Sequence, residues 1–531
     1  MKLSRSWKTH LLPWLGSSCV LLILIAIAFK SAWLATHDLD WPYDYDLYRD
    51  AAIAQTIIDG RFPADTYYAG EQNWYNPLAP AIIGGIARVS GLAPAQVYAR
   101  QGAVIALAIS LAIFALAVAL FGRWAGLASL FAFLFLGPID VPAWAAPSYS
   151  PWLFANLVSL VPFALTLIVA LRARETARFR TWAISGVLLG MTFLAHTATA
   201  ILAGCIVLVL GWDRRKPRTV AFRWGLVLLP AFIVSAPLLI SILWHYGLQI
   251  KNSAPQNFIW SENELHQLPD LLKRALNFRN AIAFAGFFML WASRRMTAAR
   301  IVFVPWLAVC VLMLGYGYAR QLWPTAQLPG LVPPFHWLFH LRLAGALLLG
   351  YGIYRGVVAW TSLVAGVLKV PVPAALVAAF LTLLLAQHWR FAQRHDFRAA
   401  RQLALENAAK VGFTETSSWL RHESASDAVV LASPLDALTL LGNAARKTVV
   451  IDQSFSNPYV LYEPRAAAAT DMYKSLADHD RGSFLETAAK YHVSYVLLGP
   501  DARAVADRCL TAPFVTKVFS HDSYTVLRVD R

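Results

Sequence analysis

Charge and cysteine are both scarce in this chain. Only 14% of its 531 residues are charged, against roughly a quarter in soluble domains, while 58% are hydrophobic. This composition excludes an ordinary soluble protein and indicates a polytopic membrane protein. The four cysteines lie far apart and form no CxxC pair, so we expect neither a disulfide framework nor thiolate chemistry from Cys19, Cys205, Cys310 and Cys509.

The chain carries a formal charge of +16, but this excess does not indicate nucleic-acid binding. Its basic residues lie in short segments beside apolar runs, where they set topology. The N-terminus and the segments 172–180, 213–223 and 294–300 together hold fifteen basic residues and two acidic ones. We therefore expect a multi-pass protein of the inner (cytoplasmic) membrane. Its N-terminus is expected in the cytoplasm, and its first loop and C-terminal domain outside.

Apolar runs recur throughout residues 1–392, the predicted transmembrane domain. A bilayer core about 30 Å thick needs roughly 20 apolar residues per helix. We predict about eleven transmembrane helices, near residues 11–35, 98–121, 124–138, 150–171, 182–196, 198–212, 222–246, 280–293, 301–319, 335–358 and 371–388. The first run is too long for a signal peptide and lacks a cleavage site, so it is expected to be retained. Residues 77–96, broken by Pro and Gly, are predicted to be helices at the outer interface of the membrane.

The last 139 residues, 393–531, are balanced in charge and contain no spanning run. Residues 428–432, 448–452 and 493–498 read as buried strands, and residues 484–491 as a helix. A β-hairpin turning at 521–523 closes the sequence. Alternating strands and helices predict a C-terminal extracytoplasmic α/β domain, with some parallel pairing.

Acidic residues are concentrated in one loop. Eight of the fourteen in the first 388 positions fall between Thr36 and Asn76, within the predicted first outer loop, 36–97. They are Asp38, Asp40, Asp44, Asp46, Asp50, Asp59, Asp65 and Glu71. Carboxylates can act as bases or hold Mg²⁺ or Mn²⁺. We therefore expect the chemistry of the protein in this loop.

Asp44 and Asp46 are two positions apart in the centre of the loop. In an extended segment both would face the same way. If a helix begins near Asp46, that residue could cap it while Asp44 stays in the preceding loop. Arg49 has the i, i+3 spacing for an ion pair with Asp46. The alternative is a solvated acidic loop with an ordinary helix cap.

Aromatic and amide side chains follow at the end of the same loop, just before the interfacial helices. Glu71, Trp74, Tyr75 and Asn76 are suited to recognising the face and the hydroxyls of a sugar. For Trp74, anchoring at the membrane interface is an equally good reading.

This loop resembles the first outer loop of the GT-C membrane glycosyltransferases, which include the oligosaccharyltransferase catalytic subunit and the protein mannosyltransferases. The resemblance rests on the acidic-aromatic stretch DYDLYR at 44–49, GRFP at 60–63, and WYNPLAP at 74–80. It implies a GT-C-like helical domain and a donor sugar linked to a polyprenyl phosphate or pyrophosphate. It also implies a catalytic Asp in the first outer loop, and often an extracytoplasmic domain after the helices.

By that resemblance, Asp44 or Asp46 is the catalytic base and the other is a helper or metal ligand. Tyr48 and Arg49 of the same stretch become candidate substrate-binding residues. The second outer loop supplies only Asp140, which is a candidate additional ligand of Mg²⁺ or Mn²⁺. The oligosaccharyltransferase subunit has a second acidic pair and a WWD-type motif that this chain lacks, so transfer to an asparagine sequon is in doubt.

Two further segments resemble parts of GT-C enzymes. His196, in the turn LAHTATA, is either a residue of the cavity wall or a satisfied interfacial histidine. In FHWLFHLRLAG, His336 and His340 share one helix face, and Arg342 enters an apolar run. A buried Arg is costly unless it meets a cavity or an anion, so Arg342 could hold the donor phosphate. Snorkelling or pairing with a loop carboxylate is the alternative.

The resemblance implies an inverting glycosyltransferase that moves a sugar from a polyprenyl carrier to a lipid, glycan or protein acceptor at the outer face of the membrane. Two other classes stay open. One is a transporter or flippase, which would need internal repeats or many charges within the helices. The other is a non-enzymatic assembly protein for envelope polysaccharide.

Overall fold

The computed structural model of the chain describes residues 4–138, 141–294, 296–368, 376–384, 386, 395–408 and 413–530. The fold separates into two compact units, each built from three stretches of chain. Unit 1 contains Met1–His37, Gly102–Ser235 and Ile259–Ala399, and unit 2 contains Asp38–Gln101, Ala236–Phe258 and Ala400–Arg531. The candidate metal ligand Asp140 lies outside the described residues. Of the predicted helix 371–388, residues 376–384 and 386 are described, and they are helical.

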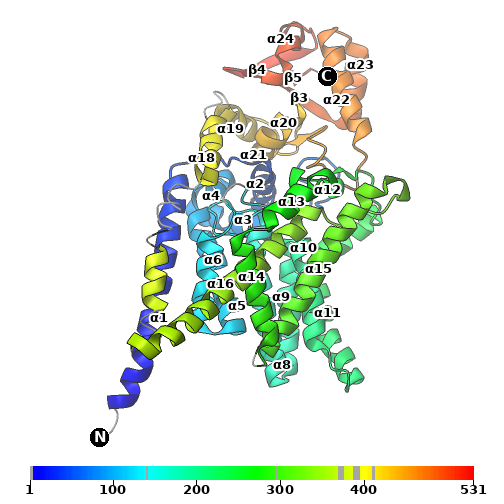
Figure 1. The fold of residues 1–531 in the computed structure, drawn as a ribbon. Helices are drawn as coiled ribbons and strands as arrows, with labels where there is room; N and C mark the ends of the chain where they lie inside the picture. Colours follow the sequence, from blue (N-terminus) through cyan, green and yellow to red (C-terminus); the bar gives the residue numbers. More distant parts are fainter. Residues whose placement is uncertain are drawn as a thin grey trace. The chain divides into compact units, whose positions relative to one another are not determined.

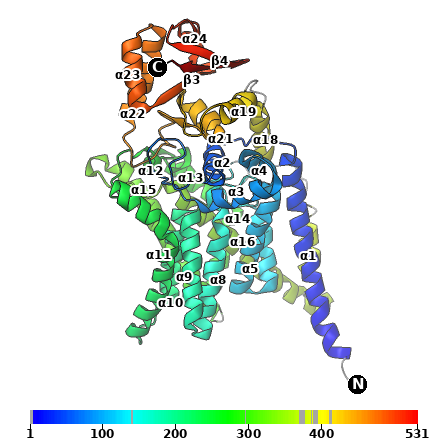
Figure 2. The same ribbon diagram turned by 180° about the vertical axis from the view of Figure 1, so that it is seen from behind.

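The regular elements in the described part of unit 1 are all helices, and the two opposite views in Figures 1 and 2 show α5, α6, α8 and α9 running side by side. Its elements are α1 (Ser4–Thr36), α5 (Gly102–Phe121), α6 (Arg123–Phe135), α7 (Ala155–Val158), α8 (Leu160–Thr176), α9 (Phe179–Ala195), α10 (Thr197–Gly211), most of α11 (Pro217–Tyr246), α13 (Leu268–Ala275), α14 (Phe278–Ala292), α15 (Thr297–Leu322) and α16 (Pro334–Leu368). Short 3-10 turns η1 (Ser261–Asn263), η2 (Leu265–Gln267) and η3 (Pro324–Ala326) join them, and α18 (His395–Ala408) crosses into unit 2.

The first ten predicted apolar runs each coincide with a helix, as expected for a polytopic membrane protein. Six helices in the described residues are long and apolar enough to cross a membrane: Leu15–Thr36, Gly102–Phe121, Ala155–Thr176, Pro217–Tyr246, Thr297–Leu322 and Pro334–Leu363. Four others, α6, α9, α10 and α14, have the apolar composition but only 10–17 residues. Seventeen residues at 1.5 Å each reach about 25 Å, somewhat less than a bilayer core. The number eleven therefore stays a prediction.

Small residues let the helices of unit 1 approach closely. A Cβ on Gly350 of α16 would lie 2.2 Å from the Cα of Ser129 on α6. On the other side of α16, a Cβ on Gly286 of α14 would lie 2.4 Å from the carbonyl oxygen of Leu348. The hydroxyl of Ser129 also donates to the carbonyl of Leu347 at 3.0 Å. Because only glycine fits at such distances, α16 is held firmly between α6 and α14.

Unit 2 begins with three helices from the first loop: α2 (Tyr45–Ile58), α3 (Leu78–Ser90) and α4 (Pro94–Arg100). Most of α2 is buried and packs on α3 and α4. The axes of α3 and α4 differ by 99° across the short break at 91–93. The predicted helices in 77–96 are therefore present, and their place at the membrane interface stays a prediction.

The rest of unit 2 is α12 (Ala254–Asn257) and the mixed C-terminal segment. Its elements are α19 (Phe413–Glu423), β1 (Val429–Leu431), α20 (Pro434–Asp436), the π-helical turn η4 (Ala437–Leu441), α21 (Gly442–Ala444), β2 (Lys447–Thr448), α22 (Glu463–Ala477), α23 (Arg481–Tyr491), β3 (Val493–Leu498), η5 (Pro500–Ala502), α24 (Arg503–Leu510), β4 (Val515–His521) and β5 (Tyr524–Val529). The strands form one sheet in the order β2-β1-β3-β5-β4. β1 pairs in parallel with β2 and β3, whereas β5 pairs antiparallel with β3 and β4.

The strands lie close to their predicted places, with one correction. The hairpin turns between His521 and Tyr524, as the sequence indicates. The strand predicted at 448–452 is instead the two residues Lys447 and Thr448. The amide of Thr448 donates to the carbonyl of Tyr67 in the first loop at 2.7 Å, so the edge of the sheet continues against that loop. Residues 449–451 are apolar because they are buried, but among the described strands they form no β-pairing.

Candidate functional site in the first loop

Asp44, not Asp46, caps α2. Its backbone is extended, with φ −117° and ψ 143°, and its Oδ1 accepts a hydrogen bond from the amide of Asp46 at 3.0 Å. The expectation that Asp46 could cap the helix was wrong by two residues, because the helix already begins at Tyr45. A cap carboxylate reaches the amide two positions on, and the spacing of the two aspartates matches that reach.

Asp46 forms the predicted ion pair with Arg49, whose Nη1 lies 2.8 Å from Oδ1 of Asp46. Arg49 also donates to Oδ1 of Asp50 from Nε at 3.0 Å and from Nη2 at 2.8 Å. Its guanidinium carbon lies 3.7 Å from the centre of the Tyr75 ring. One buried cation is therefore shared by two carboxylates and an aromatic face. Arg49 is fully occupied within the protein, which favours a positioning role over the predicted contact with substrate.

Burial is the main influence on the protonation of this cluster. Asp44 keeps some exposed surface, yet burial, reinforced by the charge of Asp46, raises its pKa to about 7. Burial also raises the pKa of Asp50 to about 6, although Arg49 opposes the shift. A carboxylate with a pKa near 7 accepts a proton more readily than an ordinary aspartate and is still ionised in about half of the molecules at neutral pH.

Asp50 is a member of the cluster that the sequence analysis did not single out. It is completely buried, and its Oδ2 has no hydrogen-bond partner within the described part of the chain. Nothing distinguished it among eight acidic residues, because its importance comes from the guanidinium that reaches it.

The aromatic residues of the loop divide into packed and accessible ones. Tyr48 is only 1% exposed and stacks on Trp41 at 6.1 Å between ring centres, which favours a packing role over the predicted contact with substrate. Tyr45, at the start of α2, is 42% exposed. Trp74 and Tyr75 are partly exposed and meet edge to face at 5.5 Å. Tyr45 directly follows Asp44 in the chain and Tyr75 lies against Arg49, whereas Tyr48 is packed in the interior.

Phe455, from the C-terminal segment, adds an aromatic ring to this group. It lies edge-on to Tyr45, 6.4 Å between ring centres, and 5.7 Å from the guanidinium carbon of Arg49. The ring is partly exposed. No local pattern points to Phe455, since about 400 residues separate it from the loop that it contacts.

Glu71 is held by two residues from distant parts of unit 2. The hydroxyl of Tyr246 donates to its Oε2 at 3.0 Å, and Nη2 of Arg465 lies 3.6 Å from its Oε1. The guanidinium of Arg465 also lies 4.2 Å from the centre of the Tyr68 ring. Asn76, predicted to contact substrate, is partly exposed beside Tyr75. Glu71 is thus fixed in place, and its role in substrate binding stays a prediction.

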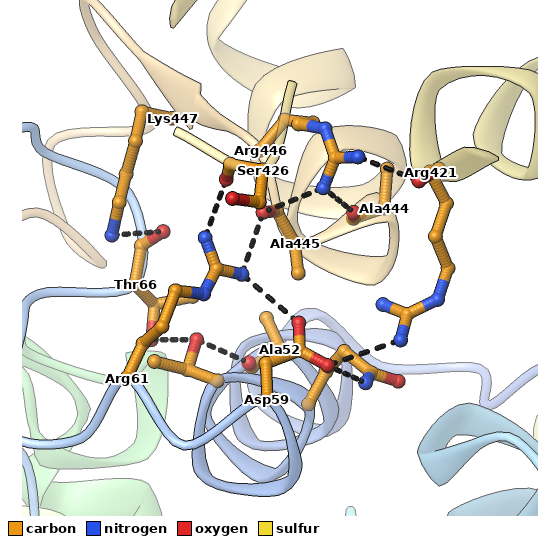
Figure 3. Close-up of polar contacts among 12 residues, drawn as sticks. Ala52, Asp59, Arg61, Thr66, Arg421, Ser426, Ala444, Ala445, Arg446 and Lys447 are labelled. Atoms are coloured by element: carbon orange, nitrogen blue, oxygen red, sulfur yellow. Dashed lines mark hydrogen bonds and ion pairs between the residues drawn. The ribbon is translucent and has the colours of Figure 1, made fainter. Parts of the chain in front are cut away.

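Basic residues of the C-terminal segment fasten the first loop (Figure 3). Asp59 accepts from Arg61 at 3.0 Å and from Arg421 at 3.1 Å. Arg61 also donates to the carbonyls of Ser426 and Ala445, at 2.5 and 2.9 Å. Two of these four contacts end on backbone carbonyls, so they fix the path of the C-terminal segment beside the loop.

A second set of contacts holds residues 65–72 of the loop. Lys447 donates to the carbonyls of Asp65 and Thr66. Asn457 donates to Oδ2 of Asp65 at 3.0 Å and to the carbonyl of Gln72 at 3.1 Å. Asp65 Oδ1 accepts from the amides of Tyr67 and Tyr68. The loop that carries the candidate site is therefore built jointly with the C-terminal segment.

In unit 1, the three histidines predicted to line a cavity come together. Thr199 links them, with its hydroxyl 3.2 Å from Nδ1 of His196 and 3.2 Å from Nε2 of His340. The rings of His196 and His336 meet at 4.5 Å between centres. The Nδ1 atoms of His336 and His340 are buried and make no hydrogen bond to any described residue. The sequence predicted these histidines but not their common partner Thr199.

Arg342, on α16, is paired with a loop carboxylate, as the alternative reading allowed. Its Nη2 forms an ion pair with Oε2 of Glu262 on η1, and its Nη1 donates to the carbonyl of Ala145 at 2.9 Å. The Trp260 ring lies 6.0 Å from its guanidinium carbon. About a fifth of the Arg342 side chain is exposed, so an incoming anion would meet Glu262 as a competitor.

The predicted metal ligands do not fit a metal site in their present arrangement. Within the described ranges, no three His, Cys, Asp or Glu side chains are grouped so that they could hold a metal ion. Asp46 is already neutralised by Arg49, and Asp140 lies outside those ranges. We therefore derive no chemical step through Mg²⁺ or Mn²⁺.

No protein-family model and no curated protein sequence matches the chain. Solved structures do. ArnT from Cupriavidus metallidurans, bound to undecaprenyl phosphate, has a TM-score of 0.56 at 12% identity, covering 96% of this chain and 97% of that one. The oligosaccharyltransferase of Archaeoglobus fulgidus, tethered to an acceptor peptide with an NVT sequon, has a TM-score of 0.52 at 13% identity, covering 98% and 75%.

The mycobacterial arabinofuranosyltransferase AftD has a TM-score of 0.53 at 15% identity, and the match covers all of this chain but 40% of AftD. At such identities, likeness establishes architecture and not activity. The resemblance first indicated by the DYDLYR, GRFP and WYNPLAP stretches is confirmed at the level of the fold. This chain has the fold of the GT-C membrane glycosyltransferases.

Proposed function

We propose that the protein is an inverting membrane glycosyltransferase that takes its sugar from a polyprenyl phosphate or pyrophosphate carrier. The observation that carries the proposal is Asp44, a carboxylate with a pKa raised to about 7 at the start of α2, in a chain with the GT-C fold. The undecaprenyl phosphate bound to ArnT supports a lipid carrier of this class.

In the proposed reaction, Asp44 accepts the proton of an acceptor hydroxyl as its oxygen attacks the anomeric carbon. The bond from that carbon to the carrier phosphate breaks, and its electron pair leaves with the phosphate oxygen. A single displacement of this kind inverts the anomeric configuration. Asp46 supports the base in two ways, since its amide holds the carboxylate of Asp44 and its charge helps to raise the pKa.

Arg342 is the proposed phosphate ligand, with His336, His340 and His196 as neighbours of the leaving group. A guanidinium can bind a phosphate through two parallel hydrogen bonds and stabilise the charge that develops on it.

The accessible rings are the proposed acceptor-binding surface. Tyr45, Trp74, Tyr75 and Phe455 offer flat apolar faces near carboxylates, a combination that suits a sugar ring with its hydroxyls. We propose that this surface and the C-terminal segment lie outside the inner membrane, with the N-terminus in the cytoplasm.

The test uses cells that carry Asp44→Asn together with Asp46→Asn at normal expression. We expect the lipid-linked donor to accumulate in membrane extracts and the corresponding glycan to disappear from the envelope, both measured by mass spectrometry. Asp40→Asn is the matched control, because Asp40 is half-exposed and pairs with Arg100 at the edge of the loop. An unchanged envelope in the double variant would defeat the enzymatic proposal and favour a transporter or an assembly protein.

A further inference from the structure

The ion pair between Arg342 and Glu262 is part of a longer charge arrangement in unit 1. Glu262 is largely buried, and its Oε2 pairs with Arg342. Its other oxygen, Oε1, lies 3.6 Å from Nη1 of Arg274 on α13. Arg274 is 70% exposed, whereas Arg342 is 19% exposed. One carboxylate thus bridges an inner and an outer guanidinium.

A carboxylate and a phosphate compete for the same features of an arginine. Each presents two oxygens that match the paired N–H groups of the guanidinium. Arg342 sits on the candidate span Pro334–Leu363, where an unpaired charge would be costly. Its charge is therefore always expected to have a counter-ion, and a phosphate can bind it fully only by replacing Glu262.

We propose that Glu262 is the resident counter-ion of Arg342 and that the phosphate of a polyprenyl phosphate displaces it. This inference rests on the proposed function, since it takes Arg342 to be the phosphate ligand. Glu262 then determines which lipids enter: a neutral lipid cannot replace a carboxylate on a guanidinium, but a phosphate anion can.

The surroundings of Glu262 lower the free-energy cost of its displacement by a phosphate. After displacement, the carboxylate keeps its ion pair with Arg274 and is not left alone in a buried place. Glu262 lies in η1, a single three-residue turn between the extended residues Trp260 and Glu264. Moving that turn breaks few backbone hydrogen bonds, so Arg274 and η1 together give the carboxylate a second position.

The test measures binding of undecaprenyl phosphate to the full chain in phosphatidylcholine nanodiscs, by native mass spectrometry across a range of lipid fractions. Glu262→Gln keeps the shape of the side chain and removes the competing charge, so we expect about tenfold tighter binding. Arg342→Gln should weaken binding by about tenfold or more. The matched control is Glu264→Gln, the same change two residues away, where the carboxylate contacts His266 and should have less than a twofold effect.

The outcomes separate the two proposals. If Arg342→Gln weakens binding while Glu262→Gln leaves it unchanged or weakens it, the counter-ion inference is wrong and the phosphate role of Arg342 stands. If Arg342→Gln has no effect, the phosphate role itself is wrong. Should Glu262→Gln fail to fold, Arg274→Gln decides instead. It removes the second partner of Glu262, so binding should weaken about threefold, and unchanged or tighter binding contradicts the inference.

Discussion

Replacing Asp44 by Asn should stabilise the protein at alkaline pH while abolishing its activity. Asn caps a helix about as well as Asp, so the hydrogen bond to the amide of Asp46 is retained. What disappears is a carboxylate that the fold prefers to keep protonated. Stability and activity should therefore move in opposite directions at this position.

The size and sign of the effect follow from the raised pKa. An Asp that titrates near 3.8 in the unfolded chain and near 7 in the fold binds its proton more tightly when folded. The corresponding stability is fully present below about pH 4 and is lost as the pH rises through 7. The difference corresponds to at most about 4 kcal/mol. Relaxation and residual exposure reduce it to about 1–2 kcal/mol.

The assay is thermal unfolding of wild type and Asp44→Asn at pH 5 and pH 8 in the same detergent. We expect the variant to melt a few degrees above wild type at pH 8, and by a smaller margin at pH 5. Asp44→Ala, which loses the cap as well, should be about 1 kcal/mol less stable than Asp44→Asn at both pH values. A variant that melts below wild type at pH 8, or by the same margin at both pH values, would refute the argument.

Two further predictions concern the neighbours of Asp44. Arg49→Met leaves Asp46 and Asp50 without their cation and should destabilise unit 2 by about 3–5 kcal/mol at pH 8. The loss should be smaller at pH 5, because Asp50, whose pKa burial raises to about 6, can then take up a proton. Equal melting losses at both pH values would contradict this. Phe455→Ala should raise the acceptor KM about tenfold with little change in kcat, whereas Phe455→Trp should keep the acceptor KM close to wild type. A fall in kcat alone would place Phe455 outside the acceptor surface.

The surroundings of Asp44 show which features of the site short-range sequence patterns can predict. The sequence singled out Asp44 and Asp46 and the ion pair between Asp46 and Arg49, because i, i+3 spacing is a local property of a helix. It could not decide which aspartate caps the helix or which has the raised pKa. The cap depends on the residue at which the helix begins, and the raised pKa of Asp44 depends on its burial in the fold.

Contacts from distant segments decided the remainder of the first-loop site. Phe455, Lys447 and Arg465 approach residues that precede them by about 380 to 410 positions. No periodicity or motif predicts such pairs, because they result from the packing of whole elements. The same holds for Glu262, which lies 80 positions before Arg342 in a loop without a recognisable pattern.

The sequence by itself determined the class of protein, the places of most helices and strands, and the loop in which to look for chemistry. Those properties follow from hydropathy and short-range periodicity, which every residue carries in its own chemistry. The tertiary structure alone decided which charges are paired, which carboxylate resists ionisation, and which aromatic rings stay accessible. Those properties depend on burial, and burial is set by residues far away in the chain.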